Sequence, residues 1–132
     1  MTNNKQQTAV DFVPYELALA LKQLGFDETC FGWFRNTEFT ISFNDLYPKE
    51  RGEEIKIIAA PTYSQAFRWF REKHGLNSFV YHYGEDGILD TIYFAYNIND
   101  NLYASDFKIY EEAELACLRH LIKLVKENEN QI

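Results

Sequence analysis

The feature that most constrains this chain is its aromatic residues: its 132 residues include 11 Phe, 9 Tyr and 2 Trp, many of them in short alternating segments. Phe39, Ile41 and Phe43 alternate with small polar residues, which is the period of a strand with one buried face. Segments 79–83 and 88–98 differ, because bulky residues occupy both alternating positions. A sheet with one solvated face alternates apolar with polar residues, so we expect both faces of this second hairpin to be covered.

Three covers fit that pattern: a helix of the same chain, a second subunit, or a bound small molecule. The tyrosines are compatible with a second subunit or a bound molecule as well as with a helix. The reason is that a tyrosine ring is apolar and its hydroxyl is polar, a combination enriched at interfaces. We therefore expect the protein to form a homo-oligomer.

Proline and glycine indicate where three helices begin and end. Pro14 and Pro61 suit a first helical turn, and Gly25 and Gly75 suit the position after a last turn. The predicted helices are 14–24, 61–74 and 110–127.

Between the helices, short apolar segments predict five strands, and Asp86-Gly87 is a strong hairpin signal. The predicted strands are 30–35, 39–43, 55–59, 79–83 and 88–98, with loops at 44–54 and 99–108. The order α-β-β-β-α-β-β-α predicts an α+β fold with an antiparallel sheet of about five strands, covered by helices on at least one face. We expect a single domain over 12–132, preceded by a flexible polar tail over 1–11.

Charge and cysteine usage limit the function classes. Twenty acidic residues against 13 basic ones give a formal net charge of −7, which disfavours binding to nucleic-acid polymers. Cys30 and Cys117 form no CxxC pair, as expected in a reducing cytoplasm. The polar N-terminus resembles no signal peptide, and no segment approaches 18 apolar residues. We expect a cytoplasmic protein without membrane contact.

The sequence shows no catalytic constellation. His74, His82 and His120 lack metal-ligand spacing, and no serine lies in a GxSxG motif. We therefore predict no catalytic residue, no metal and no cofactor. His82, flanked by Tyr81 and Tyr83, is the histidine best placed to bind a ligand.

The predicted helix 61–74 carries the clearest candidate binding site. If Phe67 and Phe70 point into the core, Arg68 and Arg71 lie outward at i, i+3 with Trp69 near the boundary. A guanidinium binds phosphate through two parallel hydrogen bonds, and an indole can stack on a base. An ordinary solvated helix face and a protein-contact face are the alternatives. The full predicted ligand site is Arg68, Trp69, Arg71, Trp33, Tyr81 and His82.

Three stretches are familiar together: FVPYELALALKQLGFDETCFGWF, APTYSQAFRWFREKHGL and YEEAELACLRHLIKLVK. They resemble a family of short uncharacterised proteins from phages and prophages of Bacteroidetes. The resemblance implies a small accessory gene of a virus or mobile element, acting in the host bacterial cytoplasm. Such genes often encode inhibitors of host defence or host enzymes. The resemblance carries over no catalytic residue, and the association is not a physical argument.

These observations predict a non-enzymatic phage accessory protein that neutralises a host defence factor by sequestering a small anionic, nucleotide-like ligand. The alternative is a protein–protein inhibitor that grips a host enzyme through an acidic or tyrosine-rich surface. A small hydrolase is the third function considered.

Overall fold

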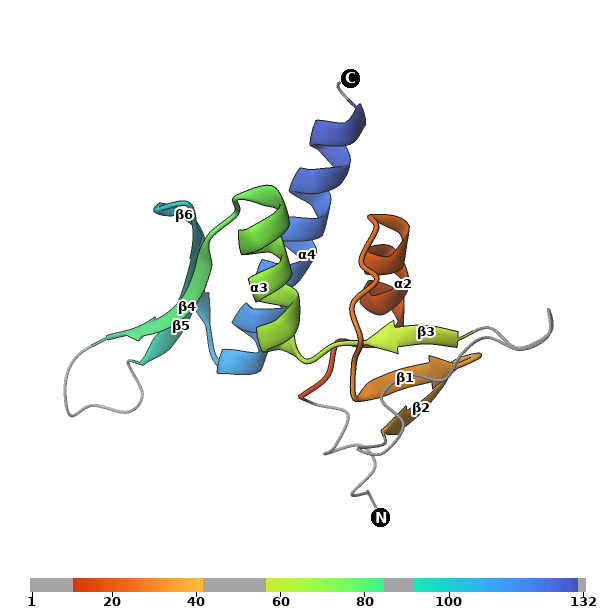
Figure 1. The fold of residues 1–132 in the computed structure, drawn as a ribbon. Helices are drawn as coiled ribbons and strands as arrows, with labels where there is room; N and C mark the ends of the chain where they lie inside the picture. The colour runs from red at the N-terminus through yellow and green to blue at the C-terminus, as the bar shows by residue number, and fades with distance from the viewer. Residues whose placement is uncertain (1–10, 42–56, 85–91, 131–132) are drawn as a thin grey trace, which may run out of the picture. The chain divides into compact units, whose positions relative to one another are not determined.

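The structure, a computed structural model, describes residues 11–41, 57–84 and 92–130. The chain divides into two compact units, one ending at Ala66 and the other beginning at Phe67. Each unit has its own three-stranded antiparallel sheet, so the predicted α+β class is confirmed (Figure 1). The prediction of about five strands in one sheet is wrong: the described strands form two sheets, with orders β2-β1-β3 and β4-β5-β6. The single domain stays a prediction.

The predicted order of elements is confirmed, with one strand added before the last helix. The elements are α2 (Tyr15–Gln23), β1 (Gly32–Arg35), β2 (Glu38–Ile41), β3 (Ile57–Ala60), α3 (Tyr63–His74), β4 (Ser78–Tyr83), β5 (Tyr93–Ile98), β6 (Asn101–Phe107) and α4 (Tyr110–Asn130). None of the helices in these described ranges combines the length and the apolar character needed to cross a membrane.

The expected end of α2 is confirmed. Gly25 has φ +104, a conformation that residues with a Cβ rarely adopt. The Gly25 N–H donates to the Lys22 carbonyl at 3.0 Å, and the Phe26 N–H donates to the Leu21 carbonyl at 3.0 Å. This pair of bonds is a Schellman motif, and it turns the chain so that Phe26 is buried.

The first unit joins the start of α2 to the start of α3. The Val13 N–H donates to the Pro61 carbonyl at 2.9 Å, and Phe12 forms a β-bridge with Thr62. The Asp11 carbonyl accepts from the Tyr63 N–H at 3.4 Å. Residue 11 is thus held in place, and the rest of the predicted flexible tail lies outside the described residues.

Helix α3 begins two residues later than predicted, because Thr62 caps it. The Thr62 Oγ1 accepts a hydrogen bond from the Gln65 N–H at 3.2 Å, which is the contact expected of an N-cap residue. The buried stripe also differs from the prediction. Trp69 and Phe70 are buried and Phe67 is half-buried, so the tryptophan lies in the core rather than at its boundary.

The boundary between the units falls inside α3, and the second unit contains the β4-β5-β6 sheet. Strands β4 and β5 pair antiparallel with Tyr83 opposite Tyr93, which confirms the predicted hairpin pairing. The expected turn at Asp86-Gly87 and the strand segment before Tyr93 fall largely outside the described residues.

Strand β6 lies where a loop was predicted. Asn99 and Asp100 have φ values of 50° and 68°, and Ile98 pairs with Asn101 across them. Positive φ at both central residues is what a two-residue type I′ hairpin turn requires. The polar segment 99–108 is therefore a tight turn followed by an irregular edge strand, whose register with β5 shifts twice.

Helix α4 covers one face of the second sheet (Figure 1). The Phe94 ring contacts Tyr110 of α4, with ring centroids 5.9 Å apart, and the Tyr96 ring contacts His120 of α4 at 5.8 Å. Because side chains alternate along a strand, Tyr93, Ala95 and Asn97 point to the opposite face.

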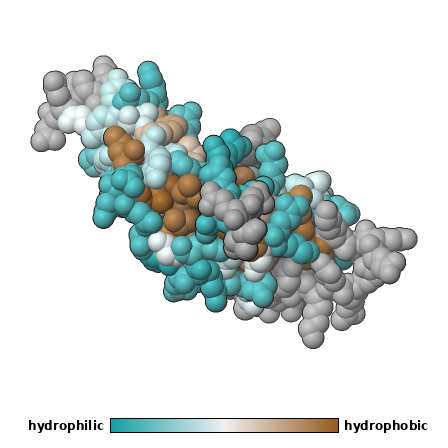
Figure 2. All heavy atoms as spheres, turned by 90° about the horizontal axis from the view of Figure 1, so that it is seen from above, coloured by the Kyte–Doolittle hydropathy of each residue, from teal (hydrophilic) through white to brown (hydrophobic). Residues whose placement is uncertain are grey.

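We call that opposite face the tyrosine face. Cross-strand partners in the register share a face, so its members are Phe79, Tyr81, Tyr83, Tyr93, Ala95, Asn97 and Leu102. On its edge strands Phe79 is 51% exposed and Leu102 is 58% exposed, whereas Ala95 on the central strand is fully buried. On the surface drawn in Figure 2, apolar residues appear in separate groups among hydrophilic ones.

Candidate functional site

A pocket of about 360 Å³ opens in the second unit, between the end of α3, the β5–β6 turn and the C-terminal half of α4. Its lining residues are His74, Leu76, Ile98, Asn99, Asn101, Tyr103, Leu124, Val125, Glu127 and Asn128. The volume lies within the range of roughly 300–1,000 Å³ found for small-molecule sites.

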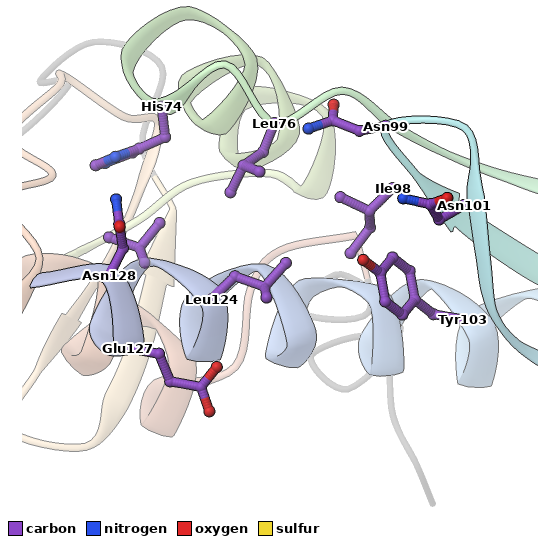
Figure 3. A pocket seen from close by; sticks show the side chains of 10 residues that line it. His74, Leu76, Ile98, Asn99, Asn101, Tyr103, Leu124, Glu127 and Asn128 are labelled. Atoms are coloured by element: carbon purple, nitrogen blue, oxygen red, sulfur yellow. The ribbon is translucent and has the colours of Figure 1, made fainter. Parts of the chain in front are cut away.

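The pocket has an apolar middle and polar ends. Figure 3 shows Leu76 and Leu124 in the middle, with His74 and Asn128 at one end and Tyr103 near the other. Such a lining accepts a ring or chain of apolar surface while its ends offer hydrogen bonds. Glu127 points away from this space in the same view.

Local backbone structure forms the α3 side of the pocket. Gly75 has φ +65, which ends the helix at His74. The Leu76 N–H then donates to the Phe70 carbonyl at 3.1 Å, and this bond folds the chain back so that Leu76 lines the pocket.

Two hydrogen bonds join the start of β4 to the β5–β6 turn. The Asn99 N–H donates to the Asn77 carbonyl at 2.7 Å, and the Asn77 N–H donates to the Asn99 Oδ1 at 2.8 Å. The Asn99 oxygen is therefore engaged with the backbone, and the turn that carries the pocket's polar end is held from both sides.

Tyr103 is supported by a histidine that is neutral near pH 7. Its ring packs edge-on against His120, with centroids 4.4 Å apart, and the Tyr96 hydroxyl lies 2.9 Å from the His120 Nδ1. Burial, aided by the charge of Lys123, lowers the pKa of His120 below its usual value. Burial likewise raises the pKa of Tyr96, so this support carries no charge.

Three predicted ligand residues lie on α3, next to the pocket. Trp69 is 4% exposed, and its ring centroid is 4.9 Å from that of His74. A ligand in the pocket therefore does not stack directly on Trp69. Instead, the Trp69 ring packs against His74, and His74 lines the pocket. Arg68 and Arg71 are exposed as predicted, and Arg71 is the i, i+3 neighbour of His74.

The other three predicted residues do not line this pocket. Trp33 lies in β1 of the first unit and is 9% exposed. Tyr81 belongs to the tyrosine face, where its ring centroid is 5.5 Å from that of Phe79. His82 is exposed on the other face of β4, with its ring 6.4 Å from that of Phe94.

The residues that the sequence analysis missed come mostly from β6 and the end of α4. Asn101 and Tyr103 were assigned to a loop, and Asn128 lies beyond the predicted end of the last helix. The Asn99-Asp100 pair could have indicated the tight turn before β6, because adjacent residues of these types tolerate positive φ. Leu124 was expected to face inward, and its partial exposure marks the wall of the pocket.

Neither cysteine has the environment of a nucleophile. Burial raises the pKa of the Cys30 thiol to about 12 and that of Cys117 to about 11, so both stay protonated near neutral pH. In the described ranges, no three His, Cys, Asp or Glu side chains are grouped so that they could hold a metal ion.

Comparison of the chain with family models, with curated proteins and with solved structures finds no match.

Proposed function

We propose that this protein is a non-enzymatic binding protein that captures a small nucleotide-like molecule in the pocket between α3, β6 and α4. The observation that carries the proposal is the pocket itself, which combines an apolar middle with hydrogen-bonding groups at both ends. Small-molecule sites generally have this character.

The polar lining favours the base and sugar of such a ligand. Asn101 and Asn128 each offer an amide with two donor hydrogens and an acceptor oxygen, and the Tyr103 hydroxyl both donates and accepts. The edge of a nucleobase and the hydroxyls of a ribose carry the same mixture of donors and acceptors. The flat faces of the base match the side chains of Leu76 and Leu124.

The arginines of α3 favour a charged group at one end of the ligand. Residues three apart on a helix are neighbours, with roughly 5–6 Å between their Cβ atoms, so Arg71 lies next to His74 and Arg68 next to Arg71. A phosphate that extends from the His74 end of the pocket would lie along this side of α3. Each guanidinium can hold a phosphate through two hydrogen bonds.

The resemblance to phage and prophage proteins supplies the proposed context. There, the protein acts in the bacterial cytoplasm and withholds a nucleotide-like signal that a host defence factor needs. Sequestration requires tight binding without conversion. The pocket is lined by amides, a hydroxyl and apolar side chains, with one histidine and one carboxylate, Glu127, among them.

The test is a thermal shift assay with a panel of nucleosides, nucleotides and cyclic or linked nucleotides. A ligand present at 100 times its dissociation constant stabilises the fold by about 2.7 kcal/mol. We expect Tyr103→Ala to weaken binding of every ligand found. Arg71→Ala should weaken binding of phosphorylated ligands and leave the matching nucleoside unaffected. Arg119→Ala, an exposed arginine of α4 away from the pocket lining, is the matched control.

Two results would overturn the proposal. One is the absence of any shift across the panel. The other is recovery of a chemically altered ligand after incubation, with the conversion lost in a variant of a single histidine or aspartate, because the protein would then be an enzyme. Binding unchanged by Arg68→Ala and Arg71→Ala would remove the phosphate part alone.

Inhibition of a host enzyme by direct contact is the second candidate. The observation that favours it is the exposed tyrosine face. Stoichiometric co-purification of a host protein, without a thermal shift from any nucleotide, would support it over ligand capture.

A further inference from the structure

The turn between β5 and β6 holds one amide of the pocket lining in a single orientation. The Asn77 N–H donates to the Asn99 Oδ1 at 2.8 Å, and the Asn99 N–H donates to the Asn77 carbonyl at 2.7 Å. A backbone N–H can only donate, so the side-chain atom that faces it must be the amide oxygen. Reversing the amide would bring two donors together and lose this bond.

This orientation decides what Asn99 offers to a ligand. Its oxygen is engaged with the Asn77 backbone, so its nitrogen, with two donor hydrogens, is what it contributes to the pocket that it lines. Figure 3 shows the Asn99 nitrogen on the side of Leu76 and the oxygen pointing away from the pocket. Because an amide nitrogen does not accept hydrogen bonds, Asn99 can pair only with an acceptor of the ligand.

The place of Asn99 in the pocket indicates which part of the ligand it meets. In Figure 3, Asn99 and Asn101 lie on the same side of the pocket as Tyr103, opposite His74. A phosphate at the His74 end, near Arg71, leaves the opposite end to the nucleobase. The edge of the base then faces the β5–β6 turn.

We propose that Asn99 selects a ligand whose nucleobase presents a carbonyl oxygen to the β5–β6 turn. This inference rests on the proposed capture of a nucleotide-like molecule and names the class of base. Guanine and uracil carry such an oxygen where adenine and cytosine carry an amino group. A carbonyl oxygen has two lone pairs, so it can accept from the Asn99 nitrogen and from a second group such as the Asn101 amide. An amino group would instead place its donors against those of Asn99.

The anchored amide discriminates between bases more strongly than a hydroxyl at the same end of the pocket. The Tyr103 hydroxyl can rotate its hydrogen to donate or to accept, so it contributes affinity to either kind of base. Asn99 cannot adapt without losing its bond to Asn77. A site that fixes a hydrogen-bonding group rejects ligands that leave the group unpaired. Because Asn99 is exposed to water, we expect discrimination of about threefold to tenfold, the effect of one net hydrogen bond.

The test is isothermal titration calorimetry of the full chain with matched ligand pairs. Inosine is compared with adenosine, uridine with cytidine, and each monophosphate with its counterpart. The sugar and phosphate are the same within a pair, so the ratio of dissociation constants reports the base alone. We expect the carbonyl-bearing member of each pair to bind about threefold to tenfold more tightly.

Asn99→Asp is the variant that addresses the orientation of the amide directly. Aspartate keeps an oxygen for the Asn77 N–H and tolerates the positive φ of 50° at this position, so the turn is preserved. It replaces the donors by an acceptor, and the preference within each pair should reverse. Asn128→Asp is the matched control, because it makes the same charge change in the lining from α4. It should keep the wild-type preference.

The possible results separate this inference from the proposed function. Equal affinities within the pairs, or tighter binding of the amino-bearing members, would overturn the role of Asn99 and leave ligand capture standing. A wild-type preference that Asn99→Asp does not change would do the same, with circular dichroism to show that the variant is folded. If the variant does not fold, the wild-type ratios decide. If no member of any pair binds, the proposed function fails and this inference fails with it.

Discussion

Gly32 offers the sharpest test of packing in the first unit. A Cβ at this position would lie 2.9 Å from the Phe39 Cε1 and 3.0 Å from the Phe12 Cδ2. The Phe12 and Phe39 rings pack against each other with centroids 5.1 Å apart, so neither ring can move away without disturbing the other. Glycine within a strand often marks such a close approach.

Gly32→Ala should therefore destabilise the fold. Overpacking by one methyl group costs about 1–3 kcal/mol, and reduced freedom of the unfolded chain offsets about 0.4–1 kcal/mol of that. Taking the middle of each range, we expect a net loss of about 1.3 kcal/mol in the free energy of unfolding, measured by urea denaturation followed by circular dichroism.

A double-mutant cycle identifies the cause. Phe39→Leu removes the ring atom nearest to the added methyl, so Gly32→Ala should cost less in that background than in the wild type. Gly25→Ala is the control: its Cβ would meet no atom within 4 Å, but its φ of +104° makes alanine strained there, at about 1–2 kcal/mol. That cost should be the same with either residue at 39. A neutral Gly32→Ala, or strictly additive effects with Phe39→Leu, would refute the reasoning.

Two further predictions follow from the burial of titratable groups. The pKa of His120 is lowered in the fold, so the unfolded chain binds a proton at this residue more readily than the folded chain does. Neutral His120 therefore contributes stability above about pH 6.5. That stability is lost as the pH falls through the lowered pKa. The advantage of the wild type over His120→Gln in urea denaturation should therefore shrink between pH 7.5 and pH 5, and a constant advantage would contradict this account. Cys30 and Cys117, with pKa values raised to about 12 and about 11, should react with a thiol reagent at pH 8 only at the rate of unfolding; rapid reaction in the native protein would show that the thiols are accessible.

The sequence predicted the helices well because their ends are determined locally. Gly25 and Gly75 adopt the positive φ expected after a last helical turn, and each helix lies within a few residues of its predicted range. The start of α3 was placed too early because Pro61 was taken as the first helical residue. The residue after it, Thr62, makes the capping hydrogen bond.

Sheet organisation could not be predicted in the same way, because strand pairing depends on residues far apart in the chain. The second hairpin differs from the first in its aromatic pattern, but that difference does not say which strands pair with which, and nothing local separates them into two sheets. Trp69 shows the same dependence on the folded chain. Its spacing in the sequence predicted a position at the edge of the apolar stripe of α3, but in the structure it is buried and its ring contacts His74. None of the six predicted ligand residues lines the pocket, although three of them lie on α3, whose last residue does.

Strand β6 links the two proposed binding surfaces of the second unit. Asn101 and Tyr103 line the pocket, and Leu102 between them pairs with Asn97 on the tyrosine face. Because successive side chains point to opposite faces, a ligand in the pocket that orders this edge strand would also order Leu102 on the tyrosine face. Coupling of this kind is reciprocal, so a molecule bound at the tyrosine face would strengthen ligand capture by the same factor, even though no residue belongs to both surfaces.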